Sequence, residues 1–127
     1  MNSFKNTKKQ GDTGLGAAIF HFTKLGQTVA IPLTDSQGYD LIADFDGSLK
    51  KNQIKSCNFK RKYFEVNLSV KGGNRTSVGS IKRFNNSNCD FLFIIVDQSQ
   101  KYLIQTKELK AKCNFVLGPK YQKYLLK

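Results

Sequence analysis

The sequence has few of the residues from which metal centres and disulfide frameworks are usually built. Its 127 residues include a single histidine, His21, and three widely separated cysteines that form no CxxC pair. One histidine excludes a multi-histidine metal centre and restricts any Ser-His-Asp triad to that residue. An odd number of spaced cysteines indicates reduced thiols rather than a disulfide framework or a zinc site, which favours a cytoplasmic protein.

Two further absences concern membranes and secretion. No apolar run approaches the roughly 18 residues that a bilayer-spanning helix needs, and residues 1–5 lack the apolar core of a secretory signal. The length fits one domain over residues 1–127, because domains typically have about 100–150 residues. We therefore expect a single domain that is neither exported nor membrane-spanning.

Acidic residues are also scarce, with 9 Asp and Glu against 21 Lys and Arg, and the formal charge is +12. Ten of the basic residues lie within 50–83, where Glu65 is the only acid. This charge exceeds what solubility needs and attracts phosphates through counterion release. The predicted partner is a nucleic acid. A membrane surface is disfavoured because no helical pattern pairs a basic face with a broad apolar one.

Hydrophobic periodicity predicts a mixed α/β domain. Apolar residues spaced by three and four favour a helix over 13–25 with Asp12 as its N-cap, and a short helix is expected over 106–113. Asp46-Gly47 is typical of a hairpin turn. Alternating or continuous apolar runs predict strands at 28–33, 39–43, 49–57, 63–70, 91–96 and 102–105.

One spacing can carry chemistry. Asp40 opens a strand, the hairpin turn follows, and the next strand carries Gln53-Ile54-Lys55. Alternation places Gln53 and Lys55 on one side of their strand, and a tight hairpin can bring Asp40 beside them. Such a group suits metal-dependent phosphodiester cleavage, since Mg²⁺ prefers oxygen ligands and lowers the pKa of a bound water. The alternative is a turn-capping aspartate and a surface lysine, because the D-x(n)-Q-x-K pattern is not specific.

Longer motifs add to this spacing, namely GDTG at 11–14, IPL to YDLI at 31–42, and NQIKS at 52–56. They resemble the PD-(D/E)XK nucleases of the intron-associated branch, which includes homing endonucleases encoded in group I introns, among them the cyanobacterial tRNA-intron type. The segments DFLF at 90–93 and KYLI at 101–104 lie where this family has its last core strands. The resemblance covers roughly residues 8–110.

The resemblance implies a restriction-endonuclease-like core, a mixed β-sheet flanked by helices, with a basic β-ribbon insertion over 58–83. It implies a sequence-specific, Mg²⁺-dependent double-strand DNA endonuclease that works as a homotetramer. Asp40 would be the main metal ligand and Gln53 a weaker neutral one, in the place of the usual acid. Ile54 would offer its carbonyl to the metal, and Lys55 would be the catalytic lysine. Mn²⁺ would serve in place of Mg²⁺, and Ca²⁺ would bind without supporting cleavage.

One position departs from the family pattern. The first helix of the family reads G-D-I-G-E, and Leu15 stands where that glutamate would be. Asp40 is then the only matched carboxylate. Two hypotheses follow. The chain is a disabled nuclease that still binds DNA, or Asp12 or another acid replaces the glutamate. The first is favoured, because a leucine on the sheet-facing side of the helix can pack in the core.

DNA would be read by a ribbon over 63–81 with a GGN tip and a second arm over 75–81, since the major groove admits a two-stranded β-ribbon. Arg75 is the expected base reader, because its planar fork matches guanine. Lys60, Arg61 and Lys62 are expected on phosphates. The remaining candidate contacts with DNA are Lys71, Thr76, Ser77, Lys82 and Arg83.

Two other classes of protein remain open. A basic RNA-binding protein would explain the charge, although RNA binders often stack bases on exposed aromatic side chains and the aromatic residues here follow apolar patterns. A Holliday-junction-type, structure-specific nuclease would share the fold and would bind branched DNA with little reading of bases.

Overall fold

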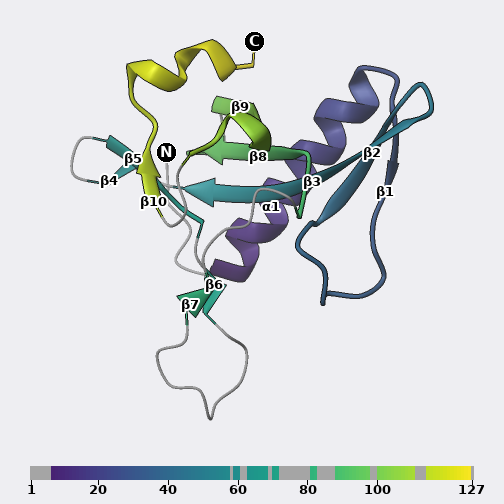
Figure 1. The fold of residues 1–127 in the computed structure, drawn as a ribbon, viewed down its shortest axis with the longest axis horizontal. Coiled ribbons are helices and arrows are strands. Elements are labelled where there is room, and N and C mark those ends of the chain that lie inside the picture. The colour runs from purple at the N-terminus through teal and green to yellow at the C-terminus, as the bar shows by residue number, and fades with distance from the viewer. Residues whose placement is uncertain are drawn as a thin grey trace.

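The computed structural model describes residues 7–57, 59–60, 63–68, 70–71, 81–82, 88–97, 100–110 and 114–126 (Figure 1). Helix α1 (Thr7–Lys24) opens the chain, and two 3-10 helices, η1 (Thr106–Glu108) and η2 (Pro119–Tyr124), lie near its end. The first five strands are β1 (Thr28–Ala30), β2 (Leu41–Phe45), β3 (Ser48–Cys57), β4 (Phe59–Lys60) and β5 (Tyr63–Asn67). The others are β6 (Val70–Lys71), β7 (Ile81–Lys82), β8 (Phe91–Val96), β9 (Gln100–Gln105) and β10 (Asn114–Val116).

A five-stranded sheet in the order β1-β2-β3-β8-β9 forms the centre of the molecule. Strands β3 and β8 run parallel, and the other neighbouring pairs are antiparallel. Smaller sheets join β10-β5-β4 and β6-β7. The mixed sheet with helices confirms the expected fold class. None of the helices in the described segments is long and apolar enough to cross a membrane.

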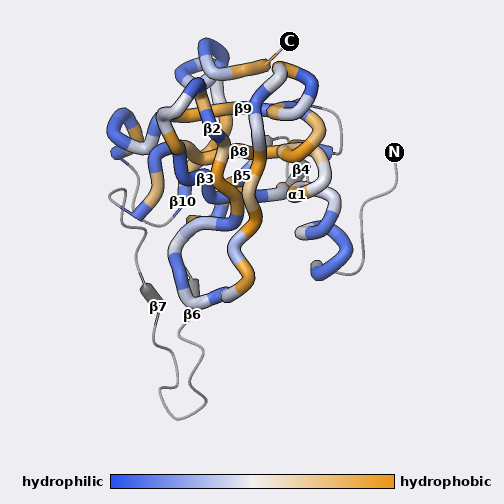
Figure 2. The backbone as a smooth tube through the Cα atoms, turned by 90° about the vertical axis from the view of Figure 1, so that its right-hand side faces the viewer, coloured by the Kyte–Doolittle hydropathy of each residue, from blue (hydrophilic) through white to orange (hydrophobic). Residues whose placement is uncertain are grey.

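The central sheet is covered on both faces. Phe93 and the helix residues Ala18 and Phe22 form a buried cluster on the α1 side. On the opposite side, Leu92 and Ile94 pack with residues of β5, β10 and the C-terminal segment. Figure 2 shows the hydrophobic stretches of chain gathered around β8. The continuous apolar run of β8 is therefore explained by burial on both faces, as predicted.

Helix α1 packs closely on β3 at Gly14, which is buried. A Cβ atom at this position would lie 2.4 Å from Ser56 Oγ and 3.2 Å from Ile54 Cγ2. Ser56 Oγ donates a hydrogen bond of 3.0 Å to the Gln10 carbonyl. Glycine thus allows the helix to lie directly on the strand that carries Gln53-Ile54-Lys55.

A pair of glycine substitutions tests this contact. Gly16 lies in the same helix and is exposed, and a Cβ atom added there would meet nothing within 4 Å. Gly16→Ala is expected to stabilise the protein by about 1 kcal/mol through helix propensity. Gly14→Ala is expected to destabilise it by about 1–2 kcal/mol, because it displaces Ser56 and crowds Ile54. Urea unfolding of both variants measures the difference, and equal effects would contradict the close packing of α1 on β3.

Several predictions for individual elements need correction. Asp12 lies inside α1 rather than at its N-cap, because the helix already begins at Thr7. The helix expected over 106–113 is reduced to the 3-10 turn η1. The chain then forms strand β10, which was not predicted and which pairs with β5. The hairpin turn is confirmed, with φ angles of 54° at Asp46 and 95° at Gly47.

The basic insertion also differs from a single long ribbon. Strand β5 pairs with β4 and β10, not with a returning arm. The ribbon is present where β6 meets β7, with Val70 opposite Lys82 and Lys71 opposite Ile81. These two strands lie at the lower end of the molecule in Figure 1, away from the central sheet. The expected GGN tip and most of the second arm, 75–81, fall outside the described residues.

Candidate active site at the open edge of β3

The candidate site lies where β3 extends beyond its neighbour β2. Pairing between the two strands ends at Leu41 and Asn52, so the β2-side edge of β3 has no strand beside it from Gln53 onward in the described chain. Asp40 occupies the beginning of this open edge. Its backbone N–H donates to the Asn52 carbonyl at 2.8 Å, and its Oδ2 accepts the Ile54 N–H at 2.9 Å. The hairpin therefore brings the carboxylate onto the Gln53-Ile54-Lys55 segment, as the spacing predicted.

Main-chain and side-chain groups of β3 lie around this edge, together with the Asp40 carboxylate. The Ile54 carbonyl points toward it, because the N–H and C=O of one strand residue face the same side and the N–H is bound by Asp40. Gln53 and Lys55 pair with Leu92 and Ile94 across the sheet, so their side chains share the face opposite α1. Both are partly buried, whereas Asp40 is exposed. The side chains of Gln53 and Lys55 therefore flank the edge from one face of the sheet, and the Ile54 carbonyl lies in the plane of the sheet.

Lys55 is perturbed by its surroundings. Burial lowers the pKa of its ammonium group, and the nearby Asp40 carboxylate acts in the opposite direction. A lysine held partly out of water beside a carboxylate is the kind of perturbed group that marks functional sites. The direction of the shift says that desolvation outweighs the attraction of Asp40.

Sequence reasoning missed a group of residues that fixes β3 from the other side. Asp90 exchanges two bonds with Lys51, since its N–H donates to the Lys51 carbonyl and its Oδ2 accepts the Lys51 N–H, each at 2.8 Å. The buried Thr106 hydroxyl donates to the Cys89 carbonyl at 2.6 Å. These bonds anchor the start of β8 beside Gln53. An acid directly before a fully apolar strand was the available signal.

Cys89 lies next to the site but is not suited to hold a metal ion there. It is buried, and the Gln53 backbone N–H is directed at its sulfur. Burial raises the pKa of the thiol to about 11, so the thiolate that a metal requires is scarce at neutral pH. His21 is also remote from this role, because it packs against Phe22 and Phe93 on the α1 side.

Leu15 lies on the α1 side of the sheet, partly buried against the cluster that contains Leu41. Its neighbour Gly14 faces Ile54, so Leu15 adjoins the point where α1 packs on β3, on the face opposite Lys55. Asp12 is exposed and precedes the sheet-facing Gly14 by two residues. Two residues correspond to a rotation of about 200° around the helix, so Asp12 points away from the sheet. The structure therefore gives no support to Asp12 as a replacement acid.

The donor set at the open edge meets the needs of a divalent ion only in part. In the described part of the chain, no three His, Cys, Asp or Glu side chains are grouped to hold a metal ion. The oxygens at the open edge belong to Asp40 and the Ile54 carbonyl, and the Gln53 amide lies on the adjoining face of the sheet. All are hard donors that fit Mg²⁺, but together they carry one formal negative charge. These residues are therefore of the chemical type that binds Mg²⁺, and their single negative charge predicts weak binding of the ion.

The predicted DNA contacts are placed only in part. Lys60 lies in β4 opposite Tyr63, and Lys71 and Lys82 lie in the β6–β7 pair. Their side chains are not among the described groups. The remaining candidates lie outside the described residues altogether: Arg61, Lys62, Arg75, Thr76, Ser77 and Arg83.

The family of the chain follows from comparison with known proteins. The family model of the PD-(D/E)XK endonucleases matches residues 5–124. The chain therefore belongs to the PD-(D/E)XK endonuclease family.

Among solved structures, the chain is similar to a bacterial homing endonuclease, I-Ssp6803I, with a TM-score of 0.80 and 27% sequence identity. The match covers 94% of this chain and 88% of that protein. The comparison with curated proteins found no match.

Proposed function

We propose that this chain is a sequence-specific, divalent-metal-dependent endonuclease of double-stranded DNA whose cleavage is weakened by Leu15. The observation that carries the proposal is the contact of Asp40 with the Ile54 N–H at the open edge of β3, beside the partly buried Lys55. Members of the family generally use divalent metal ions. The similar structure is that of a homing endonuclease, which supports the homing role proposed for this chain.

In the proposed mechanism, Asp40, Gln53 and the Ile54 carbonyl would hold Mg²⁺ or Mn²⁺, which would supply polarisation of the scissile phosphate and a water of lowered pKa. The Ile54 N–H fixes one oxygen of Asp40 and directs the carboxylate along the strand edge. Lys55 presents its ammonium to the phosphate and offsets the charge that develops in the transition state. Partial burial strengthens this effect, because fewer water molecules screen the charge.

Leu15 weakens this site because it removes one carboxylate from the metal environment. The remaining donors provide one formal charge where the family pattern provides a second. We therefore propose that the chain binds DNA and cuts it slowly, with Ca²⁺ as a non-cutting substitute for Mg²⁺. The basic insertion over 58–83 is proposed to grip DNA, with Arg75 reading bases. A homo-oligomer, such as a tetramer of small subunits, would multiply the few base pairs that one module reads.

A binding experiment distinguishes the proposed class from its alternatives. Three labelled probes, a long duplex, a four-way junction and a structured RNA, are titrated with the protein in Ca²⁺ and followed by gel shift. We expect the duplex to bind most tightly. In Ca²⁺, Asp40→Asn is expected to bind the duplex about tenfold more weakly than the wild type, because the variant loses the Ca²⁺-dependent part of the affinity. A preference for the junction would indicate a structure-specific nuclease, and a preference for RNA would refute the nuclease proposal.

A further inference from the structure

Residues of the short helix η1 line two cavities, and the first of these lies on the face of the sheet that carries Gln53 and Lys55. The first, of about 140 Å³, is lined by Lys110, Lys120 and Lys123 and is named here the C-terminal lysine cavity. The second, of about 230 Å³, includes Lys50 and Lys107. None of these lysines belongs to the proposed DNA contacts of the insertion.

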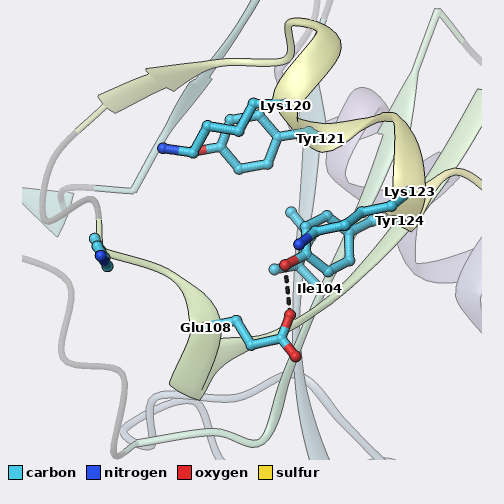
Figure 3. A pocket seen from close by; sticks show the side chains of 7 residues that line it. Ile104, Glu108, Lys120, Tyr121, Lys123 and Tyr124 are labelled. Carbon is cyan, nitrogen blue, oxygen red and sulfur yellow. Dashed lines mark hydrogen bonds between the residues drawn. The ribbon is translucent and has the colours of Figure 1, made fainter.

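The side chains around the C-terminal lysine cavity present positive charge to its mouth. Figure 3 shows Lys120 and Lys123 extending beside the rings of Tyr121 and Tyr124. Their Nζ atoms lie 5.5 and 5.2 Å from the respective ring centroids. Such contacts hold an ammonium in place without neutralising it. Each ammonium therefore stays available to an anionic ligand.

The acids beside both cavities are already engaged. Glu108 is the one acidic residue that lines the first cavity among the described residues, and its carboxylate accepts the Tyr124 hydroxyl (Figure 3). Asp90, in the second cavity, accepts the Lys51 N–H. With three lysines against one acid, the first cavity attracts anions, and its small volume suits a single phosphate rather than a larger ligand.

Strand register relates this cavity to the candidate active site. Gln53 is opposite Leu92 in β8, and Leu92 is opposite Ile104 in β9, which lines the cavity. The three residues form one row on one face of the sheet. Two strand spacings of about 4.8 Å separate the ends of the row by roughly 10 Å. Along the axis of a duplex, this distance corresponds to a rise of about three base pairs.

We propose that Lys107, Lys110, Lys120 and Lys123 form a second DNA-contacting surface, in which the C-terminal lysine cavity binds a backbone phosphate a few nucleotides from the scissile one. The inference rests on the proposed function, since it assumes duplex DNA at the β3 edge. This contact positions the strand and carries no sequence information, because phosphates are common to all sequences.

The test compares two double variants with the same change in charge. Lys120→Gln/Lys123→Gln alters the cavity, and Lys24→Gln/Lys101→Gln is the matched control on the α1 side, where both lysines act on His21. Affinity for a random 30-base-pair duplex is measured against salt concentration. The cavity variant is expected to lose at least tenfold in affinity and about 0.9 in the slope of log K against log salt, the value for one lost phosphate contact. The control is expected to stay within about twofold of the wild type.

Other outcomes decide against the inference. Equal losses of affinity in both double variants would show that the effect comes from net charge and not from the cavity. An equal or larger loss on a structured RNA would show that the surface is not dedicated to duplex DNA. Lys120→Arg/Lys123→Arg keeps the charge and is expected to retain affinity, so its failure would also contradict phosphate binding. If the wild type bound no duplex at all, the proposed function would fail and the inference with it.

Discussion

Replacing Leu15 with glutamate is expected to raise Mg²⁺-dependent DNA cleavage by roughly 10²-fold or more. The new carboxylate would approach the open edge of β3 from the α1 side, next to Gly14 and its contact with Ile54. It would add a second formal charge to a donor set that now has Asp40 as its single carboxylate. A charged ligand that strengthens metal binding and its electrostatic effect can supply the ~3 kcal/mol that this rate increase requires.

The same substitution is expected to change stability in a way that depends on metal. Leu15 packs on the core cluster of the α1 side, so a glutamate there costs about 1–3 kcal/mol in the absence of metal. Mg²⁺ or Ca²⁺ should restore part of this loss and raise Tm in a concentration-dependent manner, because an ion that binds the native state stabilises it. Thermal melting with and without Ca²⁺ measures this effect independently of cleavage.

Leu15→Gln is the matched control, because it has the size of glutamate without its charge. It is expected to destabilise the protein and to gain neither cleavage nor the Ca²⁺-dependent rise in Tm. Asp40→Ala in the Leu15→Glu background is expected to abolish the gain. If Leu15→Glu gained no Mg²⁺-dependent cleavage and Asp40→Ala changed nothing, the site would be wrongly assigned.

The elements that position the site were predictable because their sequence signals are local. The turn at Asp46-Gly47 requires two left-handed residues and fixes the register of β2 and β3. That register then places Asp40 beside Ile54. Alternation along β3 predicted which side Gln53 and Lys55 would share, and the pairing with β8 agrees.

The features that were missed depend on contacts between distant parts of the chain. Asp90 is separated from Lys51 by 39 positions, and no periodicity links them. Strand β10 is three residues long and is stabilised by pairing with β5, so its own residues carry too little signal for prediction. The open edge of β3 could not be predicted either, because it results from β2 starting at Leu41 while β3 continues to Cys57.

The second large effect is expected at Lys55. Lys55→Met in the Leu15→Glu background should reduce cleavage by about 10²–10³-fold, since it removes the ammonium that offsets transition-state charge. The same substitution should raise stability, because burial lowers the pKa of Lys55 and the native state therefore disfavours its charged form. A gain of about 1 kcal/mol, the low end for a charge that is only partly buried, corresponds to roughly 4 °C in Tm. Lys24→Met, at an exposed position of α1, is the control expected to change neither quantity.

The pH dependence of this gain separates a buried charge from improved packing. The pKa of Lys55 in the folded protein is below its ordinary value of 10.5, so the unfolded chain binds the proton more tightly. The penalty is complete below the folded-state pKa and disappears as the pH rises through 10.5. The stability advantage of Lys55→Met over the wild type should therefore be largest near neutral pH and shrink toward alkaline pH in urea unfolding. An advantage that stayed constant with pH would mean that methionine packs better at this position and that Lys55 is not electrostatically strained.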